Sequence, residues 1–240
     1  MFRLIHDGDA ARLTLDRPEV RNAIPAAGWA ELARLTGEIA ASGARLLVVG
    51  GAGEAFCAGA DLSDFPAFAG DPSASGRFRQ AMRAGLDALT GLEIPTVALI
   101  DGPCYGAGVA LALACDLRIA GPGARFAVPP ARLGISYPQE DVHRLVAQIG
   151  AGQAARLLFT GETIDGAEAA RIGLVELGGR SADEAIAAIL ASDAESLKVL
   201  KRAIALGAGG YRSDAGQDER FDALLGGGAM MRRLDALRRK

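Results

Sequence analysis

Lysine and histidine are scarce in this sequence of 240 residues, which limits the anions and metals that its side chains can hold. Lysine occurs only at positions 198, 201 and 240, so a bound phosphate would depend mainly on arginine side chains or backbone N–H groups. The two histidines, His6 and His143, have no second ligand at the spacing typical of zinc enzymes. We therefore expect no metal centre.

The sequence also lacks an excess of charge, a long apolar run and an even set of cysteines. Its formal net charge of -3 gives nucleic acid no basic surface to bind. No apolar run approaches the roughly 18 residues of a membrane span, and residues 1–10 carry acidic groups where a signal peptide is apolar. The cysteines at positions 57, 104 and 115 lie in apolar or glycine-rich surroundings and are expected to be buried free thiols. These absences predict a cytoplasmic protein that binds neither nucleic acid nor membrane.

Nucleotide-binding and serine hydrolase motifs are missing as well. The glycine-rich stretch 50–53 follows a predicted strand, but no third glycine opens a helix, which excludes the dinucleotide-binding fingerprint. The chain contains neither the Gly-Lys-Ser/Thr of a P-loop nor a Gly-x-Ser-x-Gly nucleophile turn. The chemistry must therefore come from another kind of site.

What is present is an alternation of apolar strands and amphipathic helices, with enough hydrophobic residues for one core. Apolar runs predict strands at 2–6, 11–15, 46–49, 96–100, 117–120 and 174–177. Helical spacing predicts helices at 25–42, 77–89 and 106–115, and a mostly helical chain beyond residue 141. Glycines at 150, 152, 161, 166 and 173 predict breaks, and those at 207–210 and 226–228 predict helix caps rather than hinges.

Two loops of small residues carry the functional prediction. The segment 56–62 follows the strand at 46–49, and the segment 102–108 follows the strand at 96–100. Backbone N–H groups at helix starts stabilise negative charge on a carbonyl oxygen, and small side chains let that carbonyl approach. Close packing alone explains either loop by itself, but the repetition favours a site with two convergent backbone donors, one in each loop.

Along nearly its whole length the sequence resembles the crotonase, or enoyl-coenzyme A (CoA) hydratase/isomerase, superfamily. The matching segments are Leu15-Asp16-Arg17-Pro18 with Asn22-Ala23, residues 55–62, 94–98, 101–102 and 106–116, Phe126, Phe159-Thr160-Gly161 and residues 167–175. The resemblance implies an α/β fold, with a crotonase-type spiral of ββα turns in residues 1–181. A helical C-terminal region, 182–240, is then expected to serve trimerisation or to cover the active site.

The resemblance also implies a site for an acyl-CoA thioester. In this site the N–H groups of Ala60 and Ala107 form the oxyanion hole, and CoA is part of the substrate, so no separate cofactor is expected. The implied assembly is a homotrimer or a dimer of trimers. The residues implied to bind substrate and CoA are Val20, Asn22, Ala58, Ala60, Asp61, Leu62 and Ala107. The carboxylate of Asp61 itself is better explained as a helix N-cap than as a base.

The sequence departs from the hydratases of this family at the two positions that handle protons. Those enzymes carry one glutamate in the helix after the second loop and one just after Phe126, and here these positions are Ala110 and Pro130. General acid-base catalysis typically contributes about 10²- to 10⁴-fold per group, so the replacements disfavour simple hydration. We therefore expect isomerase or lyase chemistry.

The segment 133–143 holds the polar residues that could take over proton transfer. Some isomerases of the family place an acid in this loop, so Glu140 or Asp141 is a candidate, although both also suit the N-terminus of a helix. Tyr137 and His143 match the order of residues in methylmalonyl-CoA decarboxylase, which makes a decarboxylating lyase an alternative. For Tyr137, packing with a backbone hydrogen bond is an equal alternative, and His143 is better explained as structural.

A further alternative is a homologue that binds acyl-CoA without turnover. The loss of both glutamates is consistent with such a protein as well as with a changed reaction. The acyl group is not predicted, because it depends on the conformation of the loop at 65–77.

Overall fold

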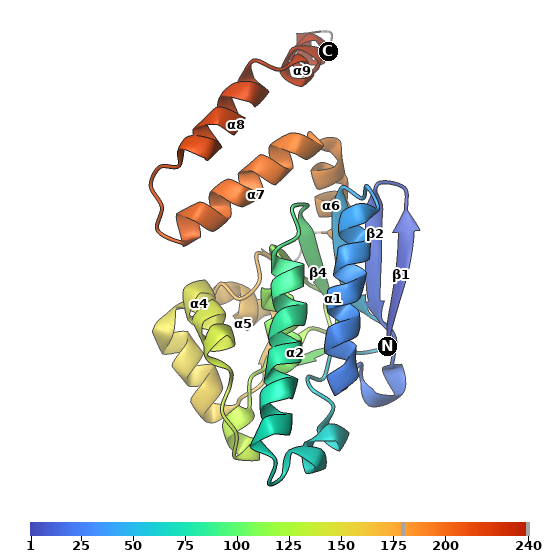
Figure 1. Cartoon of the computed structure of the whole chain (residues 1–240), viewed down its shortest axis with the longest axis vertical. Coiled ribbons are helices and arrows are strands. Elements are labelled where there is room, and N and C mark those ends of the chain that lie inside the picture. Colours follow the sequence, from blue (N-terminus) through green and yellow to red (C-terminus); the bar gives the residue numbers. More distant parts are fainter. Residues whose placement is uncertain (179–180, 239–240) are drawn as a thin grey trace.

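The computed structural model of the chain describes residues 1–178 and 181–238. The last two positions of the predicted helical region, including Lys240, lie outside the described residues. Figure 1 shows a layered core of strands and helices, from which the C-terminal helices extend at one end.

Among the described residues, a six-stranded sheet forms the centre of the core, in the order β1-β2-β3-β4-β6-β9. Its strands are β1 (Phe2–Asp7), β2 (Ala10–Leu15), β3 (Leu46–Gly51), β4 (Thr96–Ile100), β6 (Leu117–Ala120) and β9 (Leu177–Gly178). Strands β1 and β2 form an antiparallel hairpin, and the remaining neighbours pair in parallel. Buried parallel strands require apolar residues on both faces, which explains the apolar run of β3.

A second, smaller sheet turns the chain away from the first. It consists of β5 (Pro103–Tyr105), β7 (Arg125–Ala127) and β8 (Ile164–Asp165), with β7 in the middle. Because β5 follows β4 closely and β7 follows β6 closely, each turn of the chain contributes a strand to both sheets. This repeated turn is the spiral that the resemblance predicted.

Two long helices cover one face of the six-stranded sheet (Figure 1). They are α1 (Ala26–Ala41) and α2 (Pro72–Thr90). Trp29 and Leu32 of α1 and Met82 and Leu86 of α2 are buried in the same core cluster. At Gly85 a Cβ atom would lie 2.7 Å from the backbone oxygen of Trp29, so glycine is what allows the helices this close an approach.

The remaining helical elements connect the sheets and form the C-terminal region. They are the 3-10 helices η1 (Pro18–Val20), η2 (Leu62–Phe68) and η3 (Pro130–Leu133), and the α-helices α3 (Ala107–Leu113), α4 (Gln139–Thr160), α5 (Gly166–Arg171), α6 (Ala182–Ala191), α7 (Ala194–Ala208), α8 (Ala215–Leu225) and α9 (Gly228–Arg238). Figure 1 shows α7, α8 and α9 extending away from the core. No described residue of these three helices is buried.

Two cations attach the start of this helical region to the core. Lys201 on α7 forms an ion pair with Asp116 at 2.8 Å and donates to the backbone oxygen of Ile94 at 2.9 Å. Arg45 donates to the backbone oxygens of Leu190 and Ser192, at 3.1 and 2.7 Å. The N-terminal end of the region is therefore fixed, while α8 and α9 lie farther out.

The observed elements differ from the prediction at their ends and in the second sheet, whose three short strands are not predicted. Helix α2 begins at Pro72 rather than at residue 77, and the last strand occupies 177–178 rather than 174–177. The backbone is non-helical at Gly150 inside α4, as predicted, whereas the helix continues through Gly152. The cap predictions are confirmed, because Gly209 and Gly226 are the C-caps of α7 and α8. The cysteines are buried free thiols, also as predicted.

Candidate active site

The two small-residue loops, which follow β3 and β4, lie against each other. A parallel β-bridge pairs Cys57 with Cys104. Cys57 N–H donates to the oxygen of Pro103 at 3.0 Å, and Tyr105 N–H donates to the oxygen of Cys57 at 2.9 Å. Gly59 tightens the contact, since a Cβ atom there would lie 2.9 Å from the oxygen of Tyr105 and 3.4 Å from the nitrogen of Ala107. The loops that contain Ala60 and Ala107 are thus brought together.

The N–H group of Ala60 points away from the strand-like pairing that holds its loop. Ile24 N–H donates to the oxygen of Gly59 at 2.8 Å, and Asp61 N–H donates to the oxygen of Ile24 at 2.9 Å. Successive N–H groups of an extended chain point to opposite sides, so the N–H of Ala60 faces away from Ile24. Within the described chain it has no hydrogen-bond partner.

The N–H group of Ala107 is free for a different reason. Ala107 is the first residue of α3, where the first N–H groups have no carbonyl within the helix to bind. Gly106 precedes it at φ +51°, a conformation that favours glycine. In the part of the chain that the structure describes, Ala107 N–H also donates to no protein atom. Two unpaired donors therefore come from adjacent loops.

Asp61 is occupied in holding the first loop. Its carboxylate accepts from the N–H and the hydroxyl of Ser63, at 3.1 and 2.7 Å, and pairs with Arg17 at 2.9 Å. The hydrogen bonds from Ser63 and then from Arg17 hold the pKa of Asp61 below its usual value. Asp61 is the N-cap of η2, which confirms the capping interpretation.

Asn22 is likewise a structural connector through its side chain. Its Oδ1 accepts from Arg17 N–H at 2.9 Å, and its Nδ2 donates to the oxygens of Ala52 and Ala55, at 2.9 and 2.7 Å. Because the side chain is fully buried and fully bonded, only the backbone near Asn22 is available to a ligand. Ala58 is half-buried, whereas Val20 and Leu62 are exposed beside it.

The two positions that resemble those of the hydratase glutamates hold no ionisable group. Ala110 is buried on α3, and Pro130 is buried at the start of η3. The N–H of Ala110 donates to the oxygen of Gly106 at 3.3 Å, within the first turn of α3. Proton transfer at this site therefore requires other residues.

The structure separates the four polar candidates of the segment 133–143. The hydroxyl of Tyr137 donates to the oxygen of Gly106 at 2.9 Å, next to Ala107. Asp141 is fully buried in the first turn of α4, while Glu140 and His143 are exposed. Of these side chains, Tyr137 is the one that the hydrogen bonds connect to the second loop.

Asp141 lies between two arginines that the sequence did not single out. One carboxylate oxygen is 3.4 Å from Arg83 on α2 and 3.7 Å from Arg144 on α4, and the other has no hydrogen-bond partner among the described residues. Burial raises the pKa of Asp141, and the two arginines only partly oppose that effect. No sequence signal indicated Arg83, because it lies 58 positions from Asp141 in the chain.

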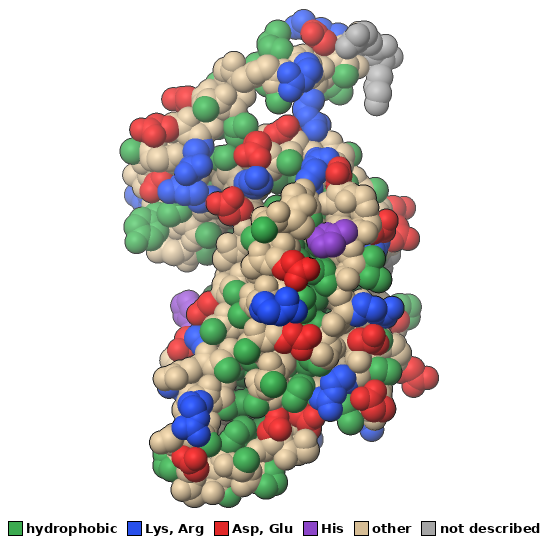
Figure 2. Space-filling view, turned by 45° about the vertical axis from the view of Figure 1, so that its right-hand side comes forward, with side chains coloured by type: hydrophobic (Ala, Val, Ile, Leu, Met, Phe, Trp, Pro, Cys, Tyr) green, Lys and Arg blue, Asp and Glu red, His purple; other side chains and the backbone are tan. Residues whose placement is uncertain are grey.

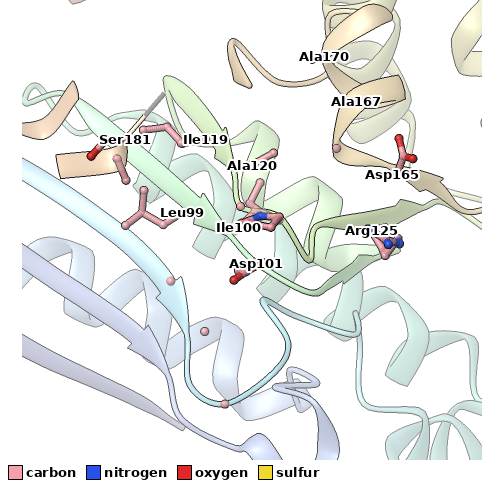
Figure 3. Close-up of a pocket in the computed structure, with 17 residues that line it drawn as sticks. Leu99, Ile100, Asp101, Ile119, Ala120, Arg125, Asp165, Ala167, Ala170 and Ser181 are labelled. Carbon is pink, nitrogen blue, oxygen red and sulfur yellow. The ribbon is translucent and has the colours of Figure 1, made fainter. Parts of the chain in front are cut away.

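A separate groove of about 1070 Å³ lies at the ends of β3, β4 and β6, beside α5. Figure 3 shows Asp101, Arg125 and Asp165 among its lining residues, together with apolar side chains such as Leu99 and Ile119. The described residues that line it include none of those predicted to bind the thioester. This groove is therefore distinct from the pair of loops.

The surface carries no single-signed patch on the face seen in Figure 2, where acidic and basic side chains alternate. The helices of the described residues include none that is both long and apolar enough to cross a membrane.

The spiral of two sheets, the covering helices and the paired loops define a crotonase-fold protein, and solved structures agree. An enoyl-CoA hydratase/isomerase family protein from Hyphomonas neptunium superposes with a TM-score of 0.90 at 33% identity, covering 98% of this chain and 94% of that one. The enoyl-CoA hydratase/isomerase family model matches residues 7–178. The chain belongs to this family.

Relatives in sequence match the same segment. The echA6 protein of Mycobacterium bovis, which carries an enoyl-CoA hydratase name, is 36% identical over 172 residues, or 71% of this chain and 68% of that protein. YngF of Bacillus subtilis is 40% identical over 169 residues, or 69% of this chain and 64% of its own length. The chain thus aligns with about two thirds of the length of these relatives.

Proposed function

We propose that this protein is an enzyme that acts on acyl-CoA thioesters by stabilising a thioester enolate. The observation that carries the proposal is the pair of unpaired N–H groups at Ala60 and Ala107 on adjacent loops. Negative charge on the thioester oxygen is stabilised by two such donors, each worth about 10²- to 10³-fold in rate. Membership of the enoyl-CoA hydratase/isomerase family supports the substrate class.

We favour isomerase or lyase chemistry over simple hydration. Ala110 and Pro130 occupy the positions that resemble those of the hydratase glutamates, and neither side chain carries a proton. Reactions that depend on enolate stabilisation more than on two carboxylates are less affected by this loss. Glu140 is an exposed candidate for moving a proton, whereas Asp141 faces Arg83 and Arg144.

Two further functions are supported by particular residues. The position of Tyr137 beside the second loop favours a lyase that resembles methylmalonyl-CoA decarboxylase. The apolar replacements at 110 and 130, with Asp141 engaged by arginines, favour a homologue that binds acyl-CoA without turnover.

The substrate is proposed to bind through the backbone of the first loop and its neighbours. Val20, Ala58 and Leu62 lie exposed or half-buried near Ala60, and the main chain at Asn22 and Asp61 completes this surface. CoA would be part of the substrate, with no separate cofactor. We also propose a cytoplasmic location and a homotrimer or dimer of trimers. The exposed apolar residues on α7 and α8 support the assembly.

A panel of enoyl-, dienoyl-, malonyl- and hydroxyacyl-CoA thioesters, analysed by mass spectrometry, tests the proposal. A shifted double bond identifies an isomerase, and loss of carbon dioxide identifies a decarboxylase. Calorimetric binding of a thioester without any product would favour the non-catalytic homologue. Absence of both binding and product would contradict the proposed substrate class.

A further inference from the structure

Each of the two proposed oxyanion donors shares a peptide group with a glycine carbonyl. The N–H of Ala60 belongs to the same peptide as the C=O of Gly59, and the N–H of Ala107 belongs to the same peptide as the C=O of Gly106. The described chain contains no cis peptide bond, so in each unit the C=O and the N–H point in opposite directions. A group that donates a hydrogen bond to this carbonyl oxygen therefore fixes the orientation of the N–H on the opposite side of the same peptide.

Different kinds of group hold the two carbonyls. The oxygen of Gly59 accepts from the backbone N–H of Ile24 at 2.8 Å. The oxygen of Gly106 accepts from the hydroxyl of Tyr137 at 2.9 Å, in addition to the N–H groups of Val109 and Ala110 at 2.9 and 3.3 Å. The Gly59 carbonyl is thus held by a short main-chain bond, with only a long contact of 3.8 Å from the thiol of Cys57, whereas the Gly106 carbonyl also accepts from a side-chain hydroxyl at 2.9 Å.

We propose that Tyr137 is a positioning residue for the oxyanion hole, which orients the peptide 106–107 and strengthens its N–H as a hydrogen-bond donor. The inference rests on the proposed function, since it gives the N–H of Ala107 its thioester ligand. A hydrogen bond accepted by a peptide carbonyl polarises the whole peptide and strengthens the bond that its N–H donates, by roughly 10–30%. Tyr137 therefore acts on the reaction through Ala107.

The surroundings of Tyr137 keep its hydroxyl in this role. A carbonyl oxygen accepts only, so the hydroxyl proton is directed at Gly106 and away from the substrate. The tyrosine ring packs against the main core cluster. Burial, followed by the charge of Asp141, raises the pKa of Tyr137 well above its usual value, while Arg144 opposes that effect. The hydroxyl therefore stays protonated, and remains a donor, at neutral pH.

The test compares the parent with Tyr137→Phe, which keeps the ring and removes the hydroxyl. The probe is a dienoyl-CoA thioester, whose ultraviolet absorption shifts to longer wavelength when its carbonyl is polarised. We expect a smaller red shift in the variant, a decrease in kcat of about 10-fold, which is less than the loss of a whole donor, and little change in KM. Ser42→Ala, which removes an exposed hydroxyl that donates to the backbone oxygen of Ile39 at 2.8 Å at the end of α1, is the control and should behave like the parent.

Three outcomes would overturn the inference. The first is a red shift in Tyr137→Phe equal to that in the parent. The second is the loss of one limb of the pH–rate profile, because that result assigns proton transfer to Tyr137. The third is an effect of equal size in Ser42→Ala. A parent that binds the thioester with no red shift would instead contradict the proposed function, so the two failures are distinguishable.

A second modification tests the same inference independently of whether Tyr137→Phe folds. Placing 3-fluorotyrosine at position 137 makes the hydroxyl a stronger donor and retains the hydrogen bond. We expect a larger red shift of the bound dienoyl thioester than in the parent. An unchanged or smaller shift would contradict the positioning role.

Discussion

At the scale of single residues, the charged side chains near the loops act as connectors, while the proposed chemistry belongs to the backbone. Arg17 joins Asp61 and the oxygen of Ala23, each at 2.9 Å, and the side chain of Asn22 joins the backbone of Arg17 to the loop that follows β3. These contacts fix where Ala60 lies without placing a side chain in front of its N–H. A site made of backbone donors keeps its hydrogen-bonding groups when nearby carboxylates are replaced.

Substitution by proline, which has no backbone N–H group, tests the contribution of a backbone donor. Ala107→Pro removes the N–H at the first position of α3, where proline fits the helix well. We expect turnover of the thioester to fall by about 10²- to 10³-fold with the fold retained. Ala107→Gly keeps the N–H and is the control, measured by the same steady-state assay and by circular dichroism. Equal rates in the proline variant and the parent would contradict the assignment of Ala107 to the oxyanion hole.

Asp141 gives the stability of the folded chain a distinctive pH dependence. Burial raises its pKa in the folded state above the unfolded value of about 3.9. The stability that this group contributes is therefore fully present below the unfolded pKa and is lost as pH rises through the folded pKa. We expect the free energy of unfolding of the parent to fall relative to that of Asp141→Asn as pH rises from about 4 to neutral.

Urea denaturation at a series of pH values measures this difference. Asp193 provides a control of opposite sign, because hydrogen bonds from Ser196 lower its pKa in the folded state. The parent should gain stability relative to Asp193→Asn as pH rises through the lowered folded pKa of Asp193 to just above the unfolded value of about 3.9, and the difference should stay constant at higher pH. A parent-to-variant difference for Asp141→Asn that is constant or grows with pH would contradict the assignment.

At the scale of secondary structure, the sequence predicts the strands of the six-stranded sheet and the long helices well, their ends less well, and the short strands of the second sheet not at all. The start of α2 at Pro72 has a local signal, since Asp71 caps Ala74 N–H at 3.0 Å and proline occupies the first turn. This signal competes with the glycine and proline residues just before it, which favour a loop. Strand β9 has two residues, too few for an apolar pattern to locate.

The close contact between the two loops depends on glycine at the start of α3. A Cβ atom on Gly108 would lie 2.5 Å from the backbone oxygen of Cys57, so Gly108→Ala must push the loops apart. We expect the variant to lose about 1–3 kcal/mol of unfolding free energy, as is typical of overpacking, and to lose activity. Urea denaturation gives the first quantity and the thioester assay the second.

Gly37 on α1 is the matched control for this prediction. A Cβ atom there would meet nothing within 4 Å, so Gly37→Ala adds a methyl group without a clash. The better helix propensity of alanine should raise the unfolding free energy by about 0.5–1 kcal/mol. A Gly108→Ala variant as stable as the parent would show that the loops tolerate separation.

At the scale of the whole molecule, the core and the C-terminal helices have different surfaces. Large apolar side chains are exposed on α7, α8 and α9 and on the turn between α7 and α8, namely Leu200, Ile204, Tyr211, Phe221, Leu225, Met231, Leu234 and Leu237. A run of exposed apolar residues on helices with no buried face is typical of a surface that contacts another protein. The proposed trimer gives this surface a function.

Ile204 is a suitable position for testing the assembly, because its side chain is 72% exposed on α7. We expect the parent to have the mass of a trimer or of two trimers in light scattering, and Ile204→Glu to have a smaller mass. Ala40→Glu adds the same charge to an exposed position of α1 and should leave the mass unchanged. A monomeric parent would contradict the proposed assembly.

The sequence predicts the fold and the two donor loops because these depend on local patterns and on resemblance along the chain. It does not predict which atoms the polar residues contact. Tyr137 and Gly106 are separated by 31 positions, and Arg83 and Asp141 by 58, so their contacts exist only after the sheets and helices pack. The same packing engages Asp141 in ion pairs and leaves Glu140 exposed, although both acids open the same helix.

The scarcity of lysine has a practical consequence for labelling experiments. Within the described chain, the two lysine side chains lie one helical turn apart on α7 and have different partners. Lys198 pairs with Glu195 of its own helix at 2.8 Å, whereas Lys201 crosses to Asp116 and Ile94 of the core. The rate at which an amine-reactive reagent labels Lys198 therefore depends on contacts within α7. The rate at which it labels Lys201 depends on how often the helical region detaches from the core, so this rate measures that motion.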